Sequence, residues 1–338
     1  MDIRYLGQEE KEKSRSLYET SFPEDSEEFV DYYYTQKCAD NQILVMEDYD
    51  EVVSMIHLNP FTVSMYGQQA KVHYIVAVAT HEDYRMQGYM RQLMERVFHD
   101  MHEAGEPFTF LTPASPDYYY SCGFEYWENQ IQLHQNQEGI WNGRQRISVA
   151  VDADCAQMAA FSNETLSGQF DLFVVKDEAY YHRLIREQEC DGGHILVIKE
   201  GEEGAFVQEE DGFVHEAEAY KDVQMAGIFC LNKGMGMYIR EPIMAHGCSE
   251  ELHAGMMGRV LNVERFCGML KSDTTISLDV RIRDTMIPEN EDCYHIEIGP
   301  DGGFAQRIYD TEPVLSMDIA ELGQMFFDKM RIYINEVV

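Results

Sequence analysis

A short run between a predicted strand and a predicted helix could bind a pyrophosphate. The run is Arg85-Met86-Gln87-Gly88-Tyr89-Met90, and it follows the almost wholly apolar stretch from Val72 to Ala79. Apolar residues at helical spacing follow it, at Met90, Leu93, Met94, Val97 and Met101. A glycine-containing turn at a helix N-terminus presents converging N–H groups and the positive end of the helix dipole. Gly88 would let the backbone approach the phosphates, and Arg85 would add a charge-assisted contact.

A second run strengthens this interpretation, and the two together resemble the GNAT acetyltransferase superfamily. The superfamily motif is Q/R-x-x-G-x-G/A after the fourth strand. Arg85 and Gly88 match it, whereas Met90 departs from it in the last position. A second family signature is a tyrosine four residues before Gly-Phe, which Tyr119 matches ahead of Gly123-Phe124. The resemblance implies an acetyl-CoA-dependent acyltransferase.

The same resemblance implies roles for individual residues. Tyr119 would be the general acid that protonates the departing thiolate, with Tyr120 as the alternative. Backbone N–H groups near Val76 and Val78 would bind the acetyl carbonyl and the pantetheine arm. Ser115 would touch the cofactor or cap a helix. The pyrophosphate would be held beside Arg85, mostly by the main chain of Met86, Gln87, Gly88, Tyr89 and Met90.

More narrowly, Val78-Ala79-Thr80, Tyr84-Arg85 and Gly88-Tyr89-Met90-Arg91 are similar to the Eis-type branch of the superfamily. That branch joins two GNAT-like domains, the second without cofactor, to a C-terminal domain resembling sterol carrier protein. The implied fold class is α+β (mixed α/β): tandem GNAT folds with mixed central sheets flanked by helices, followed by a small α+β domain. The branch also implies a homo-oligomer, a trimer or hexamer.

The candidate base also comes from the resemblance. In the Eis-type branch the C-terminal carboxylate acts as base or amine anchor, which here would be that of Val338. Glu27 and Glu28, near the first predicted helices, are weaker candidates. His57, His73 and His81 border strands and are expected to be structural.

A partial internal repeat favours tandem domains. Ile43-Leu44-Val45-Met46 resembles Ile195-Leu196-Val197-Ile198, and a tyrosine-rich segment precedes each copy. The second copy has no Arg-x-x-Gly run that opens a helix. The last ninety residues predict a helix over 260–270, a strand over 274–282, a hairpin around Pro300-Asp301-Gly302-Gly303 and a final helix capped by Ser316 or Asp318. We therefore expect domains at 1–148, 149–250 and 251–338.

Composition restricts the partners. The chain has 61 acidic and 26 basic residues, a net charge of −35, which would repel nucleic acid and anionic membranes and attract cationic amines. Its eight cysteines are scattered without a Cys-x-x-Cys pair, so we expect no metal and no disulfide. The sequence shows neither a membrane span nor a signal peptide, which predicts a cytoplasmic protein.

Two functions remain open from the sequence. The leading one is direct transfer of acetyl from acetyl-CoA to a primary amine of a cationic small molecule, aminoglycoside- or polyamine-like. The alternative is a carrier of lipid or another hydrophobic ligand that retains a vestigial acetyltransferase domain. Because a carrier would not need Arg85, Gly88 and Tyr119 together, we favour the enzyme.

Overall fold

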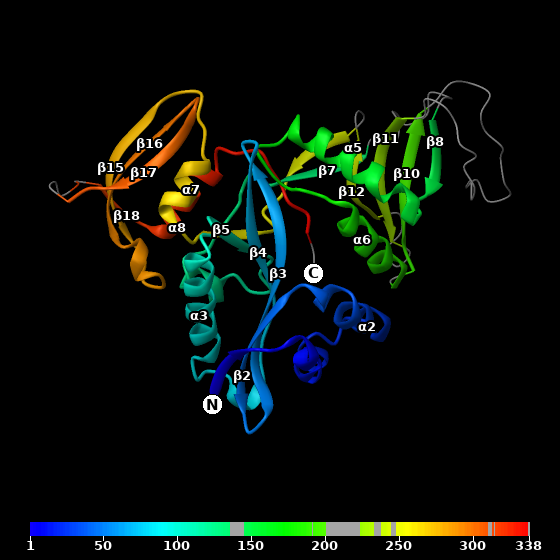
Figure 1. Cartoon of the computed structure of the whole chain (residues 1–338), viewed down its shortest axis with the longest axis horizontal. Helices are drawn as coiled ribbons and strands as arrows, with labels where there is room; N and C mark the ends of the chain where they lie inside the picture. Colours follow the sequence, from blue (N-terminus) through cyan, green and yellow to red (C-terminus); the bar gives the residue numbers. More distant parts are fainter. Residues whose placement is uncertain are drawn as a thin grey trace.

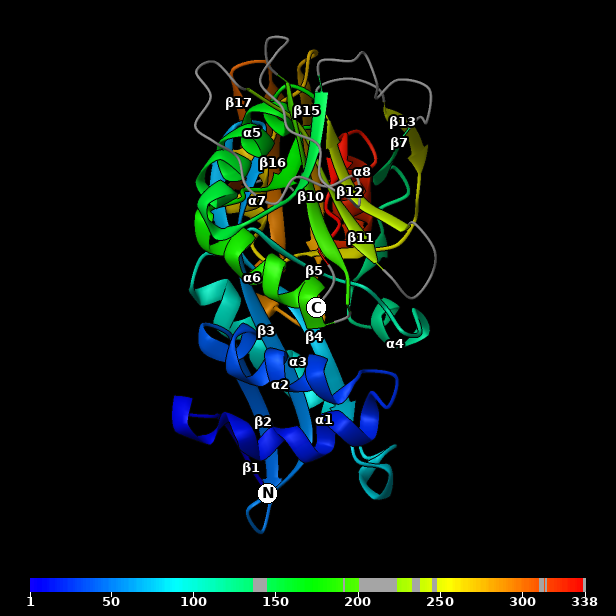
Figure 2. The same ribbon diagram turned by 90° about the vertical axis from the view of Figure 1, so that its right-hand side faces the viewer.

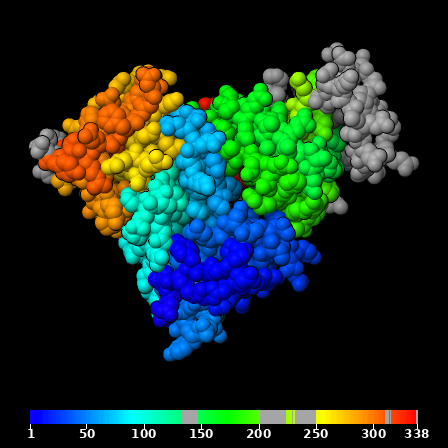
Figure 3. All heavy atoms as spheres, viewed as in Figure 1, coloured from blue at the N-terminus to red at the C-terminus, as the bar shows by residue number. Residues whose placement is uncertain are grey.

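The computed structural model describes residues 1–135, 145–190, 192–200, 224–232, 238–244, 248–309, 313 and 315–336. Helices flank several sheets, and the elements fall into three regions along the chain (Figure 1). In the space-filling view the green second region and the orange third region lie on either side of the blue and cyan first region (Figure 3). No helix within the described residues is long and apolar enough to cross a membrane.

A mixed sheet forms the centre of the first region, and its hydrogen-bonded order is β1-β2-β3-β4-β5-β14-β6. Two further strands, β9 (Leu172–Val174) and β19 (Ile332–Tyr333), pair with each other, and β9 also pairs with β3. The elements of this region are β1 (Asp2–Tyr5), α1 (Arg15–Ser21), α2 (Glu27–Thr35), β2 (Gln42–Asp48), β3 (Glu51–Met65), β4 (Gln68–Thr80), α3 (Tyr89–Glu103), β5 (Phe108–Leu111), α4 (Asp117–Tyr120) and β6 (Glu125–Tyr126).

Alternating apolar side chains let the first sheet bury both faces. On β2, Leu44 and Met46 pack in the cluster that holds the apolar stripe of α3. Ile43 and Val45 point to the opposite face, where they pack with α1 and α2. Ser26 caps α2 by accepting a hydrogen bond from the N–H of Phe29, as the sequence predicted. The two helical layers therefore lie on opposite sides of this sheet (Figure 2).

The second region repeats the order of two helices followed by antiparallel strands. Its sheet has the order β12-β11-β10-β8, and α5 and α6 pack on it around Tyr181, Ile195 and Val197. A separate pair joins β7 to β13. The elements are β7 (Ile131–Gln135), β8 (Gln145–Val149), α5 (Cys155–Ser167), α6 (Glu178–Cys190), β10 (His194–Glu200), β11 (Gln224–Asn232), β12 (Tyr238–Met244) and β13 (Cys248–Leu252).

The third region is a four-stranded sheet, β17-β16-β15-β18, packed against α7 and α8. Its first strand, β14, leaves that sheet and lies between β5 and β6 of the first region. Its core is continuous with the α3 face of the first sheet. The elements are β14 (Met257–Val260), α7 (Val263–Met269), β15 (Ile276–Arg283), β16 (Asp292–Gly299), β17 (Gly302–Arg307), β18 (Leu315–Asp318) and α8 (Ile319–Phe327).

Most predicted elements are confirmed, and two need correction. Residues 52–58 and 61–65 are not separate strands, because β3 runs straight through Pro60. Pairing of β2 with β3 ends at Leu58, so Pro60 lies beyond the partner strand, where its missing N–H costs nothing. The predicted helix over 260–270 begins only at Val263, capped by Asn262, because Val260 belongs to β14. Asp318, one of the two predicted caps, is the N-cap of α8.

Candidate active site

A break in strand pairing opens the first sheet beside β4. The register between β3 and β4 shifts after Met55, and Ala77 on β4 has a positive φ of 49°. Such a bulge turns a strand away from its neighbour. On its other side β4 runs parallel to β5, and the two pair only at Tyr74 with Phe110. The strands therefore diverge beyond Tyr74, so the main chain near Val78 is left without a neighbour on the β5 side.

The loop after β4 has the backbone of an anion-binding turn. Met86 has φ +62° and Gly88 has φ +78°, and Gly88 is the N-cap of α3. The N-cap has no side chain, so the first N–H groups of this 15-residue helix lack a capping acceptor. A Cβ on Gly88 would meet nothing within 4 Å, so the positive φ rather than crowding favours glycine here. The Arg85 side chain donates from Nε to the carbonyl of Thr80 at 3.1 Å and holds the loop against the strand end.

Tyr119 lies on the single turn α4, which follows β5. Its side chain is 7% exposed, whereas its neighbours Tyr118 and Tyr120 are 64% and 42% exposed. The ring of Phe124 packs edge-on against Tyr119, with centroids 5.9 Å apart. Burial raises the pKa of Tyr119 to about 12, helped by the nearby Cys122 and Tyr74. The phenol therefore stays protonated at neutral pH and can act as a proton donor.

These three features surround one cavity of about 580 Å³. Its lining combines β4, the turn before α3, α4 and the end of α1. The lining residues are Ser21, Phe22, Val78, Ala79, Thr80, Tyr84, Arg85, Met86, Gly88, Tyr89, Met90, Arg91, Ala114, Ser115, Asp117, Tyr118, Tyr119, Ser121 and Cys122. A helix N-terminus, unpaired strand edge and protonated phenol thus face one space.

The cavity brings together most of the predicted cofactor residues. Val78, Arg85, Met86, Gly88, Tyr89, Met90 and Ser115 line it together with Tyr119. Val76 and Gln87 lie outside its lining; the amide of Gln87 turns back to the carbonyl of Asp83. Glu27 and Glu28 are exposed in the first turn of α2, outside the lining as well.

Sequence reasoning missed the contribution of α1. Ser21 and Phe22, at the end of that helix, line the cavity although they are about 55 residues from Val78. No motif marks them, because their position depends on how α1 packs across the sheet. Phe22 does precede Pro23, and a proline shortly after a predicted helix signals its end.

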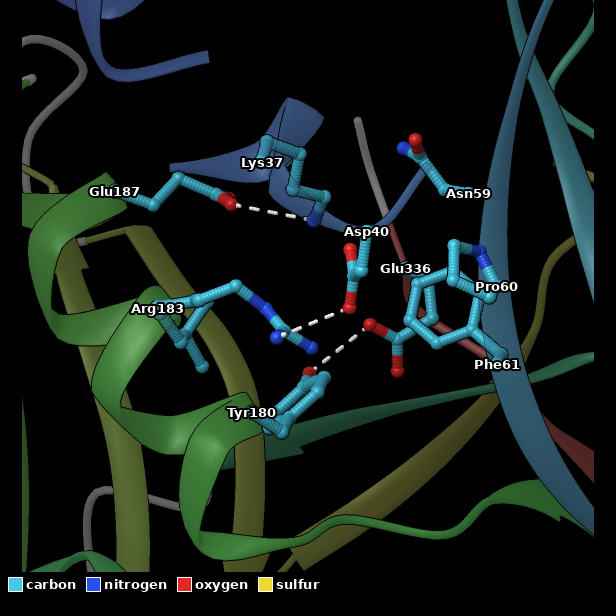
Figure 4. A pocket seen from close by; sticks show the side chains of 10 residues that line it. Lys37, Asp40, Asn59, Pro60, Phe61, Tyr180, Arg183, Glu187 and Glu336 are labelled. Carbon is cyan, nitrogen blue, oxygen red and sulfur yellow. Dashed lines mark hydrogen bonds and ion pairs between the residues drawn. The ribbon is translucent and has the colours of Figure 1, made fainter. Parts of the chain in front are cut away.

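A second, much smaller pocket of about 20 Å³ lies where the first and second regions meet (Figure 4). Two ion pairs cross it: Lys37 lies 3.7 Å from Glu187, and Arg183 lies 3.4 Å from Asp40. Tyr180 donates to the carboxylate of Glu336 at 3.0 Å. The predicted base, Val338, lies outside the described residues, so Glu336 is the nearest described residue to it in sequence.

Comparison with known proteins identifies the first region. Residues 2–127 match the family model described as an acetyltransferase (GNAT) domain. These residues form a GNAT acetyltransferase domain. The match includes the cavity, so the expected acyltransferase class is confirmed. No curated protein matches the chain.

Solved structures show that the fold extends over nearly the whole chain. A probable N-acyltransferase of unknown function from Enterococcus faecalis superposes with a TM-score of 0.73 at 15% identity, covering 96% of this chain and 89% of that one. A GCN5-related N-acetyltransferase from Anabaena variabilis gives 0.73 at 14%, covering 96% and 90%. Eis1 from Mycobacterium abscessus gives 0.67 at 12%, covering 97% and 90%. The mixed α/β class is confirmed, and at these identities the likeness shows the fold alone.

The predicted absence of a metal stays a prediction. Among the described residues, Asp152, Cys155 and His182 bring three potential ligand atoms within 4.8 Å of one another. Arg186 already pairs with Asp152 at 2.9 Å, and Cys155 is buried, which raises the pKa of its thiol to about 11. Both features oppose a metal at that position.

Proposed function

We propose that the GNAT domain transfers acetyl from acetyl-CoA directly to a primary amine of a cationic small molecule. The observation that carries this proposal is the cavity itself, because the N-terminus of α3 and Tyr119 line the same space. The pyrophosphate would bind at Gly88, Tyr89 and Met90, where helix N–H groups and the helix dipole favour an anion. The pantetheine arm would lie along the unpaired edge near Val78.

Tyr119 would supply the proton that the departing thiolate needs. Its raised pKa keeps the phenol protonated, and its burial limits competition from water. Transfer forms a C–N bond between the amine and the acetyl carbon and breaks the C–S bond, and the phenol protonates the sulfur. The base that accepts the amine proton is proposed to be the C-terminal carboxylate of Val338.

The position of Glu336 supports a chain end near the acetyl group. Glu336 shares the small pocket with Phe61, whose ring centroid lies 6.4 Å from that of Tyr74. Tyr74 in turn is close enough to Tyr119 to contribute to its raised pKa. A row of rings thus links the pocket that holds Glu336 to Tyr119. The amine would approach from this side of β4, opposite the cofactor loop.

The acceptor class follows from charge. With 61 acidic and 26 basic residues, the surface potential draws cations toward the domain. Spermidine and kanamycin represent the two expected classes, polyamines and aminoglycosides. Four further expectations remain proposals: a degenerate GNAT-like region at 149–250, a sterol-carrier-like region at 251–338, a homo-oligomer (trimer or hexamer) and a cytoplasmic location.

The test measures release of CoA thiol from acetyl-CoA with spermidine or kanamycin as acceptor. We expect turnover by the wild-type protein and a loss in kcat of about 100-fold in Tyr119→Phe, as expected for removal of a general acid. Tyr120→Phe is the matched control, since this neighbour lies outside the cavity lining, and it should keep wild-type kcat. Acetyl-CoA binding without turnover of either amine would contradict the proposed acceptor class, and no binding would favour the carrier alternative.

A further inference from the structure

One fully buried arginine of the third region reaches into the acetyltransferase domain. Arg259 lies on β14, the strand inserted between β5 and β6, and its side chain is 0% exposed. Burying a guanidinium is costly unless it is paired and hydrogen-bonded. Its contacts therefore identify the parts of the structure that depend on it.

The first contact is with the turn that carries Tyr119. Nη1 of Arg259 donates to the carbonyl of Cys122 at 2.7 Å. The N–H of Cys122 donates in turn to the carbonyl of Tyr119 at 2.9 Å, so the arginine holds the end of this turn. The next residue, Gly123, has φ +80°, and a Cβ there would lie 2.2 Å from Nη1. The glycine of the Gly-Phe signature thus leaves room for the guanidinium.

The second contact anchors the guanidinium in the third region. Nη2 donates to both carboxylate oxygens of Asp284, at 2.7 and 2.9 Å. Asp284 also accepts from the N–H groups of Met286 and Ile287 and from the amide of Asn290. This fixed carboxylate holds the arginine in one position.

The third contact reaches the helix that begins at the cofactor loop. The guanidinium carbon lies 4.6 Å from the ring centroid of Phe98 on α3. Phe98 packs against Phe124, which packs against Tyr119. Arg259 is therefore in contact with both α3 and the residues around Tyr119.

We propose that Arg259, held by Asp284, is a positioning residue for Tyr119. The turn α4 has only four residues and cannot hold a side chain in place by itself. A proton donor must keep a narrow geometry relative to the sulfur, and small displacements cost rate rather than binding. The third region thus completes the acetyltransferase site through one hydrogen bond. This inference rests on the proposed role of Tyr119 as acid.

A double-mutant cycle tests it with CoA release from acetyl-CoA and spermidine or kanamycin. Arg259→Met should lower kcat by about 10-fold, because it displaces the donor without removing it. Acetyl-CoA affinity, measured by calorimetry, should stay unchanged. In a Tyr119→Phe background the same substitution should cost little more, because no donor remains to be positioned. Equal losses in both backgrounds, or wild-type kcat in Arg259→Met, would overturn the inference.

Arg307→Gln is the matched control. Arg307 also contacts a carboxylate, on Glu264, and a backbone carbonyl, on Glu289, but its side chain is 38% exposed on β17. It should keep wild-type kcat. Should Arg259→Met fail to fold, Asp284→Asn replaces it in the cycle. That variant keeps the side-chain shape, and it should give a smaller loss in the same direction.

A measurement without acceptor separates this inference from the proposed function. In protein labelled with 3-fluorotyrosine, the fluorine resonance that Tyr119→Phe removes belongs to Tyr119. It should shift in Arg259→Met and in Asp284→Asn, and it should stay in place in Arg307→Gln. A Tyr119 resonance unmoved by both of the first two variants would refute the positioning role. Wild-type kcat in Tyr119→Phe would instead refute Tyr119 as the acid.

Discussion

The first and second regions begin alike and differ where the cavity forms. In each, two helices precede a strand with the same order of exposed and buried positions, Gln42–Asp48 in the first and His194–Glu200 in the second. Each strand then pairs with an antiparallel partner whose register is broken by an irregularity. The predicted repeat therefore corresponds to a shared order of elements (Figure 1).

The regions diverge after their third strand. In the first, β4 carries the bulge at Ala77 and leads through the turn at Gly88 into α3. In the second, the next described strand after β12 is β13, which pairs with β7. All residues that line the large cavity belong to the first region. The shared order builds a core, and the bulge and turn add the cavity.

The largest expected effect comes from blocking the turn. Gly88→Glu places a carboxylate where the pyrophosphate would bind, and like-charge repulsion should weaken acetyl-CoA binding about 1,000-fold. Calorimetry measures it. Gly67→Glu is the matched control, because Gly67 has a similar φ of 79° and equally open surroundings, but lies in the β3–β4 turn. Equal affinity in the two variants would remove the distinction between the regions.

A cut in the second region should affect stability and leave the cofactor site intact. Lys176 is 2% exposed and pairs with Glu336 at 3.1 Å. Lys176→Met leaves that carboxylate without its charged partner and should lower the free energy of unfolding by about 3 kcal/mol. Denaturant titration gives this value, and calorimetry should show unchanged acetyl-CoA affinity.

The matched control for that cut is Lys199→Met. Lys199 pairs with Asp154 at 2.6 Å, but both side chains are more exposed than those of the buried pair. Its loss should cost about 1 kcal/mol or less. A large fall in acetyl-CoA affinity in Lys176→Met would show that the second region helps to form the cofactor site.

A buried histidine of the first region should make stability depend on pH. Burial lowers the pKa of His57 to about 3, while Tyr33 bonds to its Nδ1. Below about pH 6.5 the unfolded chain binds a proton that the folded chain refuses, so stability falls as pH falls. This histidine should contribute a slope of about 1.4 kcal/mol per pH unit between pH 6 and pH 4. Denaturant titrations of His57→Gln should lack this contribution; an identical slope would contradict it.

The smallest expected effect is an absence of change. With a pKa of about 12, Tyr119 remains protonated where an ordinary tyrosine, with a pKa near 10, would begin to ionise. The kcat measured with a saturating amine should therefore stay level from pH 8 to pH 10. A fall to half by pH 10 would place the phenol in water rather than in the buried position.

The sequence by itself determined the features that depend on neighbouring residues. The apolar strand, the glycine turn and the stripe of α3 lie within 35 residues, and local backbone preference with periodicity suffices to predict them. Tyr119 was found because its signature is also local. The cap of α2 at Ser26 and the hairpin after β16 were predicted for the same reason. Local patterns overreached at Pro60 and Val260, where the neighbouring strand decides the outcome.

Only the tertiary structure decided what joins distant segments. Phe22 reaches the cavity because α1 packs across the sheet, and Glu336 meets Lys176 across 160 residues of chain. Arg259 meets the carbonyl of Cys122 across 137 residues. No periodicity encodes such contacts, because they arise from the pairing of strands and the burial of charge in three dimensions. The sequence thus located the cofactor turn and its acid, while the fold determined which residues hold that acid in place.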